Sequence, residues 1–582
     1  MYRKVCSACI VVLTCMGGIF AENALDTAVI DITKPPYNAI GDGITDNTGA
    51  FQDALHRAGE GPAGGKVFVP RGNYLIKGNL RFRPNVTLEG VWDFPPHSPQ
   101  CWEAVDSKAP LPGSVLLAVE GEGDPEGTPF ITLHTNCAVK GMVIYYPNQT
   151  KTNPPKSYPW TVAVNESGAD HCTILEVLMV NPYQAVNFGR AGSGRHFIRD
   201  LYAYPLYRGL FVDQCYDIGR VENIHFWPFW GYTGDDDPVG RFVTENAEAF
   251  IIGRTDWEYM VNCFAIFYKV GFHFIKTAAG SPNVLLTQSG SDICPDAVLV
   301  DDCQSHAGVS FVNSQLFGRI RVSETNTGPV RFTGCGFFGA TREKAPKEPI
   351  HFEIAGTGHV SLDNCHLITL SPQKDINTCI LARGGGLSVM NCLFMDAGRT
   401  YFQLEPGLRT GIICGNTFRG VSRIVNNAKG NVQIGLNADE RMPEEPGAIV
   451  IDNTAPDGSF STEGTWFLGK SGSDYMGVVS WAEKGDGSSK AWWRPDFPES
   501  GRYEVFIWHG DDPNNDHAID APIVIRHKGG NTERRLNLRE KAGQWRSLGF
   551  FDFDQGRSGD IMMHNGANGN VLADAMKFCI QK

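Results

Sequence analysis

Short stretches of alternating apolar and polar residues recur along the chain, and each ends in two turn residues and a cysteine. Residues 328–335, 358–365 and 385–392 share the order glycine, spacer, apolar, polar, apolar, two turn residues, cysteine. An apolar residue follows each cysteine two places later. A period of two is typical of β-strands with one buried face. The three segments therefore predict strands that stack in a common register.

The cysteine slot can be followed toward the N-terminus. Its predicted members are Val177, Leu201, Ile224, Cys263, Cys303, Cys335, Cys365 and Cys392. Their separations of 24, 23, 39, 40, 32, 30 and 27 residues form a self-similar period. Such a period marks a solenoid, and strands without intervening helices make it a parallel β-helix. The cysteines are expected to stack as small buried apolar groups rather than to bind metal.

Each turn of a β-helix forms one rung. Two of the predicted rungs are longer than the others, and their extra residues fall at 228–253 and 277–288. Insertions in a solenoid project from one face, which is often the binding face. These two insertions are expected to wall a cleft across the middle of the helix.

A resemblance supports this fold. The segment 41–55, GDGITDNTGAFQDAL, leads into a helical stretch, and GGKVFVPRGNYLI follows at 64–76. Both resemble the opening of pectate-lyase-superfamily β-helix proteins, a group that includes polygalacturonases, rhamnogalacturonases and phage tailspikes. The resemblance implies an all-β, right-handed parallel β-helix over residues 29–435, with a short helix that caps its N-terminal end.

A second resemblance covers the C-terminal part. Residues 436–447 are rich in proline and charge, as expected of a linker. Beyond them, the motifs at 451–453, 472–475, 501–505 and 573–575 resemble the golvesin-type C-terminal domain, also seen on xanthan-lyase-like enzymes. The resemblance implies a β-sandwich accessory domain over residues 448–582. Such domains are sometimes described as carbohydrate-binding.

Composition and the N-terminus narrow the functional classes. The 582-residue chain has a net charge of -13, which argues against a nucleic-acid partner. Arg3 and Lys4 precede an apolar run that ends near Ala21, so residues 1–21 predict a signal peptide. The run is too short for a comfortable membrane span. We expect a secreted protein, extracellular or periplasmic, with no membrane span.

The central rungs carry the candidate catalytic residues. Counting back seven residues from the slots gives glycine on outer rungs, at Gly194, Gly328, Gly358 and Gly385, and aspartate on three central rungs, at Asp217, Asp256 and Asp296. Stacked carboxylates repel, which would raise the pKa of one of them. An acid beside an ionised partner suits glycoside hydrolysis, with adjacent rungs for retention and alternate rungs for inversion. The ladder could instead bind Ca²⁺ or serve only as turn residues.

Further candidates flank this ladder. Asp236 lies in an acidic triplet, and Glu258 occupies an inward slot, either as a buried acid with a raised pKa or through an error of register. Candidate substrate-binding residues combine aromatic faces for sugar rings with polar groups. They are Trp227, Trp230, Tyr232, Trp257, Arg254, Asp292 and His306. Trp227 and Trp230 could equally anchor a loop.

These observations favour a carbohydrate-active enzyme that cleaves a polysaccharide, foremost a glycoside hydrolase. A polysaccharide lyase acting on uronic acids is the first alternative, and a non-catalytic glycan-binding or surface structural protein is the second. The active-site pattern of polygalacturonases is not reproduced, so no roles are carried over from that family. No cofactor is required, Ca²⁺ is possible, and the oligomeric state stays open.

Overall fold

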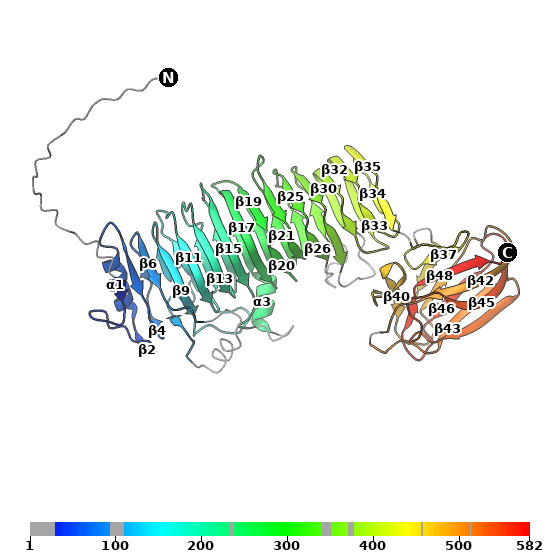
Figure 1. Cartoon of the computed structure of the whole chain (residues 1–582), viewed down its shortest axis with the longest axis horizontal. Coiled ribbons are helices and arrows are strands. Elements are labelled where there is room, and N and C mark those ends of the chain that lie inside the picture. The colour runs from blue at the N-terminus through cyan, green and yellow to red at the C-terminus, as the bar shows by residue number, and fades with distance from the viewer. Residues whose placement is uncertain are drawn as a thin grey trace, which may run out of the picture.

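The computed structural model describes residues 29–93, 110–231, 237–339, 351–369, 378–440, 442–455, 458–512 and 514–581. The predicted signal peptide lies outside these residues. Among the residues described, no helix has the length and apolar character needed to cross a membrane. A long solenoid runs from the N-terminal helix to a separate C-terminal domain (Figure 1).

The predicted capping helix is α1 (Thr48–Ala58). Its buried residues Phe51, Ala54, Leu55 and Ala58 follow the spacing of one helical face. That face packs on the first strands, at the blue end of the solenoid (Figure 1).

The solenoid consists of three parallel sheets, so the predicted parallel β-helix is confirmed. The first sheet contains β1 (Val29–Asp31), β3 (Gly65–Phe68), β6 (Val86–Glu89), β9 (Ala138–Tyr145), β11 (Thr173–Met179), β13 (Phe197–Ala203), β15 (Gly219–Phe226), β17 (Thr255–Ile266), β19 (Pro282–Thr287), β22 (Val309–Val312), β25 (Val330–Thr333), β28 (His359–Asp363), β30 (Thr378–Met390), β32 (Thr400–Cys414) and β35 (Asn431–Gly435).

The second sheet continues from the ends of β9, β11, β13, β15 and β17. Its other strands are β2 (Asp42–Asp46), β4 (Gly72–Ile76), β7 (Ser114–Ala118), β20 (Gly290–Asp292), β23 (Gln315–Phe317), β26 (Gly336–Gly339), β29 (His366–Thr369), β31 (Leu393–Phe394), β33 (Thr417–Arg419) and β36 (Ala438–Glu440).

The third sheet includes the starts of β30 and β32. Its other strands are β5 (Leu80–Arg81), β8 (Ile131–Leu133), β10 (Trp160–Val164), β12 (Gln184–Phe188), β14 (Arg208–Val212), β16 (Glu248–Ile252), β18 (Val270–Phe274), β21 (Asp296–Val300), β24 (Arg319–Val322), β27 (Phe352–Ile354) and β34 (Arg423–Asn426).

One residue per rung turns the chain from the first sheet into the second. Asn223, Asn262, Asn364 and Asn391 adopt positive φ angles of 53°, 53°, 54° and 56° at this turn. Asparagine tolerates this left-handed conformation better than most residues. The Asn-Cys pairs in the sequence mark this corner, because the next residue points into the core.

The predicted cysteine slot is confirmed except at Cys303. Ile224 pairs with Cys263, and the register of the neighbouring strands continues this column through Ser289, Ser314, Cys335, Cys365 and Cys392. The Cys263 N–H donates to Ser289 Oγ at 3.2 Å. Cys303 instead follows β21, where its thiol donates to Asn326 Oδ1.

The predicted 40-residue rung is therefore wrong. Residues 277–288 contain β19, a strand of the first sheet, and do not form an insertion. Ser289 and Ser314 occupy the slot on these rungs. A pattern that follows cysteine and apolar residues therefore does not detect the additional rung. The other predicted insertion, 228–253, is confirmed in part: α3 (Pro238–Asn246) lies between β15 and β16, but residues 248–252 form β16 itself, a strand of the third sheet.

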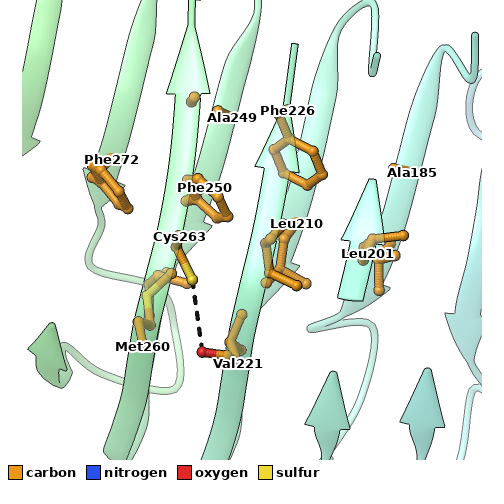
Figure 2. Packing of buried hydrophobic residues seen from close by; sticks show 14 of the residues in the cluster. Ala185, Leu201, Leu210, Val221, Phe226, Ala249, Phe250, Met260, Cys263 and Phe272 are labelled. Atoms are coloured by element: carbon orange, nitrogen blue, oxygen red, sulfur yellow. Dashed lines mark hydrogen bonds between the residues drawn. The ribbon is translucent and has the colours of Figure 1, made fainter. Parts of the chain in front are cut away.

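Aromatic and aliphatic side chains form one continuous core inside the solenoid (Figure 2). Phe250 stacks on Phe226 and on Phe272, each with ring centroids 4.9 Å apart. Phe250 and Phe272 pair on successive rungs of the third sheet, whereas Phe226 reaches Phe250 from the end of β15. Both contacts remove apolar surface from water, and the pairing of like residues helps to fix the register of neighbouring strands.

The C-terminal part has its own hydrophobic core and antiparallel sheets, which confirms the predicted β-sandwich. One sheet contains β37 (Ile449–Asp452), β48 (Ala575–Ile580), β42 (Gly501–Trp508) and β45 (Arg546–Phe553). A second contains β38 (Phe460–Glu463), β41 (Lys490–Trp493), β46 (Asp560–His564), β43 (Ala521–His527) and β44 (Gly530–Leu536). A small third sheet contains β39 (Phe467–Gly469), β40 (Val479–Ala482) and β47 (Val571–Ala573).

Candidate functional site

Polar and aromatic side chains gather where the chain turns from the third sheet into the first, on the central rungs. We call this region the polar corner. It comprises Asp213, Tyr216, Arg254, Asp256, Trp257, Lys276, Asp301, Asp302 and Gln304. Each follows the end of a third-sheet strand or begins the next first-sheet strand, so the winding of the solenoid places them on neighbouring rungs.

The predicted ladder of three carboxylates is only partly present. Asp217 and Asp256 lie on adjacent rungs, since Gly219 pairs with Glu258 and the Asp256 N–H donates to Cys215 O. Asp296 does not continue this ladder. It begins β21 in the third sheet and pairs with Arg319, whereas Pro282 occupies the rung after Asp256. The error follows directly from the misplaced Cys303 slot.

Arginine side chains, rather than neighbouring acids, surround all three carboxylates. Arg195 donates to Asp217 at 3.1 Å, and Arg319 and Arg321 lie 2.9 and 3.1 Å from Asp296. The hydrogen bond from the Ile218 N–H, together with Arg195, lowers the pKa of Asp217. The acid with a raised pKa that mutual repulsion predicted is therefore not found at this position.

Asp256 is held ionised and remains partly open to solvent. Arg254 contacts its two oxygens at 2.6 and 3.0 Å, and Gln304 donates to it at 3.2 Å. The Arg254 guanidinium lowers the pKa of this carboxyl, whose side chain is 40% exposed. Such a carboxylate can accept a proton from water or stabilise a developing positive charge.

Asp301 and Asp302 extend the corner and were missed from the sequence. Asp301 accepts hydrogen bonds from His273 Nε2 at 2.9 Å and from Ser323 at 2.7 Å. Asp302 accepts one from Ser281 at 2.7 Å. An acidic pair directly after the buried strand 296–300 is the available signal, but the sequence pattern places this segment in the cysteine slot.

His273 links two carboxylates on the outer face of the third sheet. Its Nδ1 lies 3.1 Å from Glu248, and its Nε2 contacts Asp301. Burial alone would lower the pKa of this imidazole, but the hydrogen bonds to Asp301 and Glu248 raise it to about 9. His273 therefore carries a proton at neutral pH, and its hydrogen bond lowers the pKa of Asp301.

Aromatic side chains project from the corner beside Asp256. Trp257 is 55% exposed, Tyr216 is 59% exposed and Tyr259 is 37% exposed. The Arg254 guanidinium lies over the Tyr216 ring at 5.4 Å. Trp257 has a φ of 60°, which is unusual for a bulky residue. Strained positions of this kind cluster at functional sites.

The strain at Trp257 accompanies a β-bulge between Thr255 and Glu258, whose side chains both point inward. Glu258 is fully buried and contacts His196 Nε2 at 2.7 Å. The alternative of a register error is therefore wrong. Burial by itself lowers the pKa of His196, but Glu258 and Cys215 raise it to about 10. Glu258 is inaccessible to a polysaccharide on the surface.

The other predicted site residues are dispersed. Trp227 and Trp230 pack against the core, in keeping with a loop anchor. Tyr232 and Asp236 lie outside the described residues. Asp292 ends β20 on the second sheet, where burial raises its pKa. His306 is exposed in the turn after β21 and interacts electrostatically with Asp256. The structure thus brings together Arg254, Asp256, Trp257 and His306.

Two family models match parts of the chain. Residues 35–213 match the family described as rhamnogalacturonase A/epimerase, pectate lyase-like. Residues 449–580 match the golvesin C-terminal domain.

Curated and solved relatives match parts of the chain at low identity. A xanthan lyase from Bacillus sp. (strain GL1) is 28% identical over 197 residues, which cover 31% of this chain and 20% of the lyase. The tail spike protein of Shigella phage Sf6 is 22% identical over 457 residues, covering 69% of this chain and 64% of the tail spike. This chain thus spans less than two thirds of either relative.

Among solved structures, a tailspike protein of E. coli bacteriophage HK620 in complex with a pentasaccharide is 10% identical, with a TM-score of 0.41, over 96% of this chain and 94% of that chain. This chain thus joins a parallel β-helix, whose residues 35–213 match a pectate-lyase-like family, to a C-terminal domain that matches the golvesin C-terminal domain.

Proposed function

We propose that this protein is a secreted carbohydrate-active enzyme that hydrolyses a polysaccharide bound along the polar corner. The observation that carries the proposal is the exposed Trp257 ring next to the ionised, partly exposed Asp256. Aromatic faces bind the apolar faces of sugar rings, and a carboxylate beside them acts on the glycosidic bond. The relationship to carbohydrate-acting proteins of the same fold supports this substrate class.

The spacing of the acidic groups favours inversion. Asp256 and Asp301 lie on alternate rungs, with the turn between β18 and β19 between them. Two rungs correspond to roughly 10 Å along the axis, closer to the ~6.5–9.5 Å of inverting pairs than to the ~5 Å of retaining pairs. Asp256 then activates water, and the protonated His273 supplies a proton to the leaving sugar through Asp301, the carboxylate that its Nε2 contacts.

A panel of polysaccharides tests this function. The secreted full chain is incubated with neutral and uronate-containing polymers, and new reducing ends and unsaturated-uronate absorbance are followed together. Hydrolysis yields reducing ends without that absorbance. Appearance of the absorbance would instead establish elimination, and binding without products would establish a non-catalytic glycan-binding protein.

A further inference from the structure

A pocket of about 230 Å³ lies in the C-terminal sandwich, away from the polar corner. The small sheet of β39, β40 and β47 forms one side, and the segment between β42 and β43 forms another. Its lining includes Trp481, Asn514, Asp516, His517 and Asn570. No residue of the proposed catalytic region contributes to it.

The His517 imidazole in this pocket lacks the hydrogen bonds that its burial demands. The residue is 9% exposed, and its Nδ1 has no hydrogen-bond partner within the described part of the chain. Its Nε2 lies 3.8 Å from Asp512 Oδ1 and 3.8 Å from Asp516 Oδ1, which is too far for a hydrogen bond. The unpaired Nδ1 is unfavourable in a buried ring, whereas Nε2 is the nitrogen that faces the two carboxylates.

The two carboxylates that face this ring are held in place by other groups. The N–H groups of Asp516 and His517 donate to Asp512 at 2.9 and 3.0 Å. Asn570 donates to Asp516 Oδ2 at 3.1 Å, which leaves Oδ1 toward the imidazole. Arg539 Nε also lies 3.5 Å from Asp512 Oδ2. The backbone and amide contacts are of the kind that orient metal ligands in proteins.

We propose that Asp512, Asp516 and His517 bind a divalent transition-metal ion such as Zn²⁺ at the wall of this pocket. One ligand atom from each residue lies within 4.8 Å of the other two. Ligands about 2.1 Å from a tetrahedral ion lie roughly 3.4 Å apart, close to the 3.8 Å that separates His517 Nε2 from each carboxylate oxygen. The imidazole favours Zn²⁺ over Ca²⁺, which takes oxygen ligands.

The metal would retain an open coordination position. Three protein ligands leave the fourth position of a tetrahedral ion free, as in zinc sites that bind a further ligand. Asp516 and His517 both line the pocket, so that position faces the pocket.

A second cluster of possible ligands has to be distinguished experimentally. His196, Cys215 and Glu258 also meet within 4.8 Å. However, they lie fully inside the solenoid, and His196 and Glu258 already share a 2.7 Å hydrogen bond. A metal bound there would have a thiolate ligand, whereas one bound at Asp512, Asp516 and His517 would have none.

Cobalt titration of the chelator-treated full chain separates the two sites. We expect one equivalent of Co²⁺ to bind, with visible d–d bands and without the intense charge-transfer band of a thiolate. Asp516→Asn and His517→Gln should each weaken binding by at least about 100-fold. His527→Gln is the matched control, because His527 contacts Thr532 at the end of β43, and it should leave binding unchanged.

Three results would overturn the proposal: no saturable binding by the wild-type chain, binding that survives both substitutions, or a thiolate charge-transfer band. Asp516 is 49% exposed, so Asp516→Asn should fold normally, which near-ultraviolet circular dichroism verifies. The titration does not depend on glycan cleavage, so its result tests metal binding whether or not the proposed hydrolysis is correct.

Discussion

His196 and Glu258 form a 2.7 Å hydrogen bond inside the solenoid although a complete rung lies between them. Gly219 occupies that intervening rung, paired with Glu258 and adjacent to His196. A Cβ atom on Gly219 would lie 2.2 Å from Glu258 Oε2 and 2.5 Å from His196 Nε2. The two polar side chains thus fill the space that a side chain would take on the middle rung.

Gly219→Ala should destabilise the solenoid. The added methyl group cannot be accommodated without displacing the buried ion pair, and overpacking of this kind costs about 1–3 kcal/mol. Denaturant unfolding measures the change. Gly435→Ala in β35 is the control, because a Cβ there meets nothing within 4 Å. Equal unfolding midpoints for the two variants would show that the ion pair does not need the space at Gly219.

Stability should fall at alkaline pH because of His196. Its pKa in the folded protein is about 10, above the ordinary value of 6.5. A raised pKa means that the folded state holds the proton more tightly, so this contribution is complete below pH 6.5 and is lost as the pH rises through 10. Thermal unfolding across this window should show a smaller decline in Glu258→Gln than in the wild type. Parallel curves for the two proteins would argue against the ion pair.

Much of the fold could be predicted because the solenoid repeats local signals. The Asn-Cys pairs at 262–263, 364–365 and 391–392 combine a left-handed turn residue with a small core residue, and both requirements recur on every rung. Ser289 and Ser314 satisfy the same slot by accepting or donating backbone hydrogen bonds. A pattern based on apolar residues misses such positions.

The site was harder to predict because it depends on which residues become neighbours across rungs. The sequence pattern places Cys303 in the slot that Ser289 occupies. Asp296 is therefore assigned to the wrong edge of the solenoid, and Asp301 and Asp302 are not recognised as site residues. Asp256, Arg254 and Trp257 were found because they lie together in sequence. The bulge that turns Trp257 outward and Glu258 inward has no local signal, since it depends on His196 two rungs away.

Trp257→Gly should weaken glycan binding without loss of stability. Glycine adopts the positive φ at this position without strain, so the folded state should be as stable as the wild type. Loss of the exposed ring should reduce affinity for the substrate about tenfold, as expected when an aromatic contact is removed. Isothermal titration calorimetry with the polysaccharide that the wild type cleaves measures the effect.

Leu436→Gly provides the matched control for this substitution. Leu436 also has a positive φ, of 54°, and is 89% exposed, but it lies at the far end of the solenoid. Its replacement should leave affinity unchanged. Equal affinities for Trp257→Gly and Leu436→Gly would remove Trp257 from the binding surface.

The rate of hydrolysis should decline above pH 9. His273 supplies the proton in the proposed mechanism, and its pKa is about 9, so deprotonation above this value removes the acid. The wild-type profile of kcat against pH should show this alkaline limb, and His273→Gln should lower kcat and abolish the limb. His359→Gln, on the distant strand β28, should retain the wild-type kcat and the alkaline limb. An unchanged limb in His273→Gln would assign the titration to another group.

The most direct test of the account is the rate at which Asp256→Asn releases reducing ends from the polysaccharide that the wild type cleaves. We predict a loss of about 10²–10⁴-fold, because the amide cannot take a proton from water. Glu120→Gln, an exposed substitution after β7, should keep the wild-type rate. Wild-type activity in Asp256→Asn would contradict hydrolysis at the polar corner.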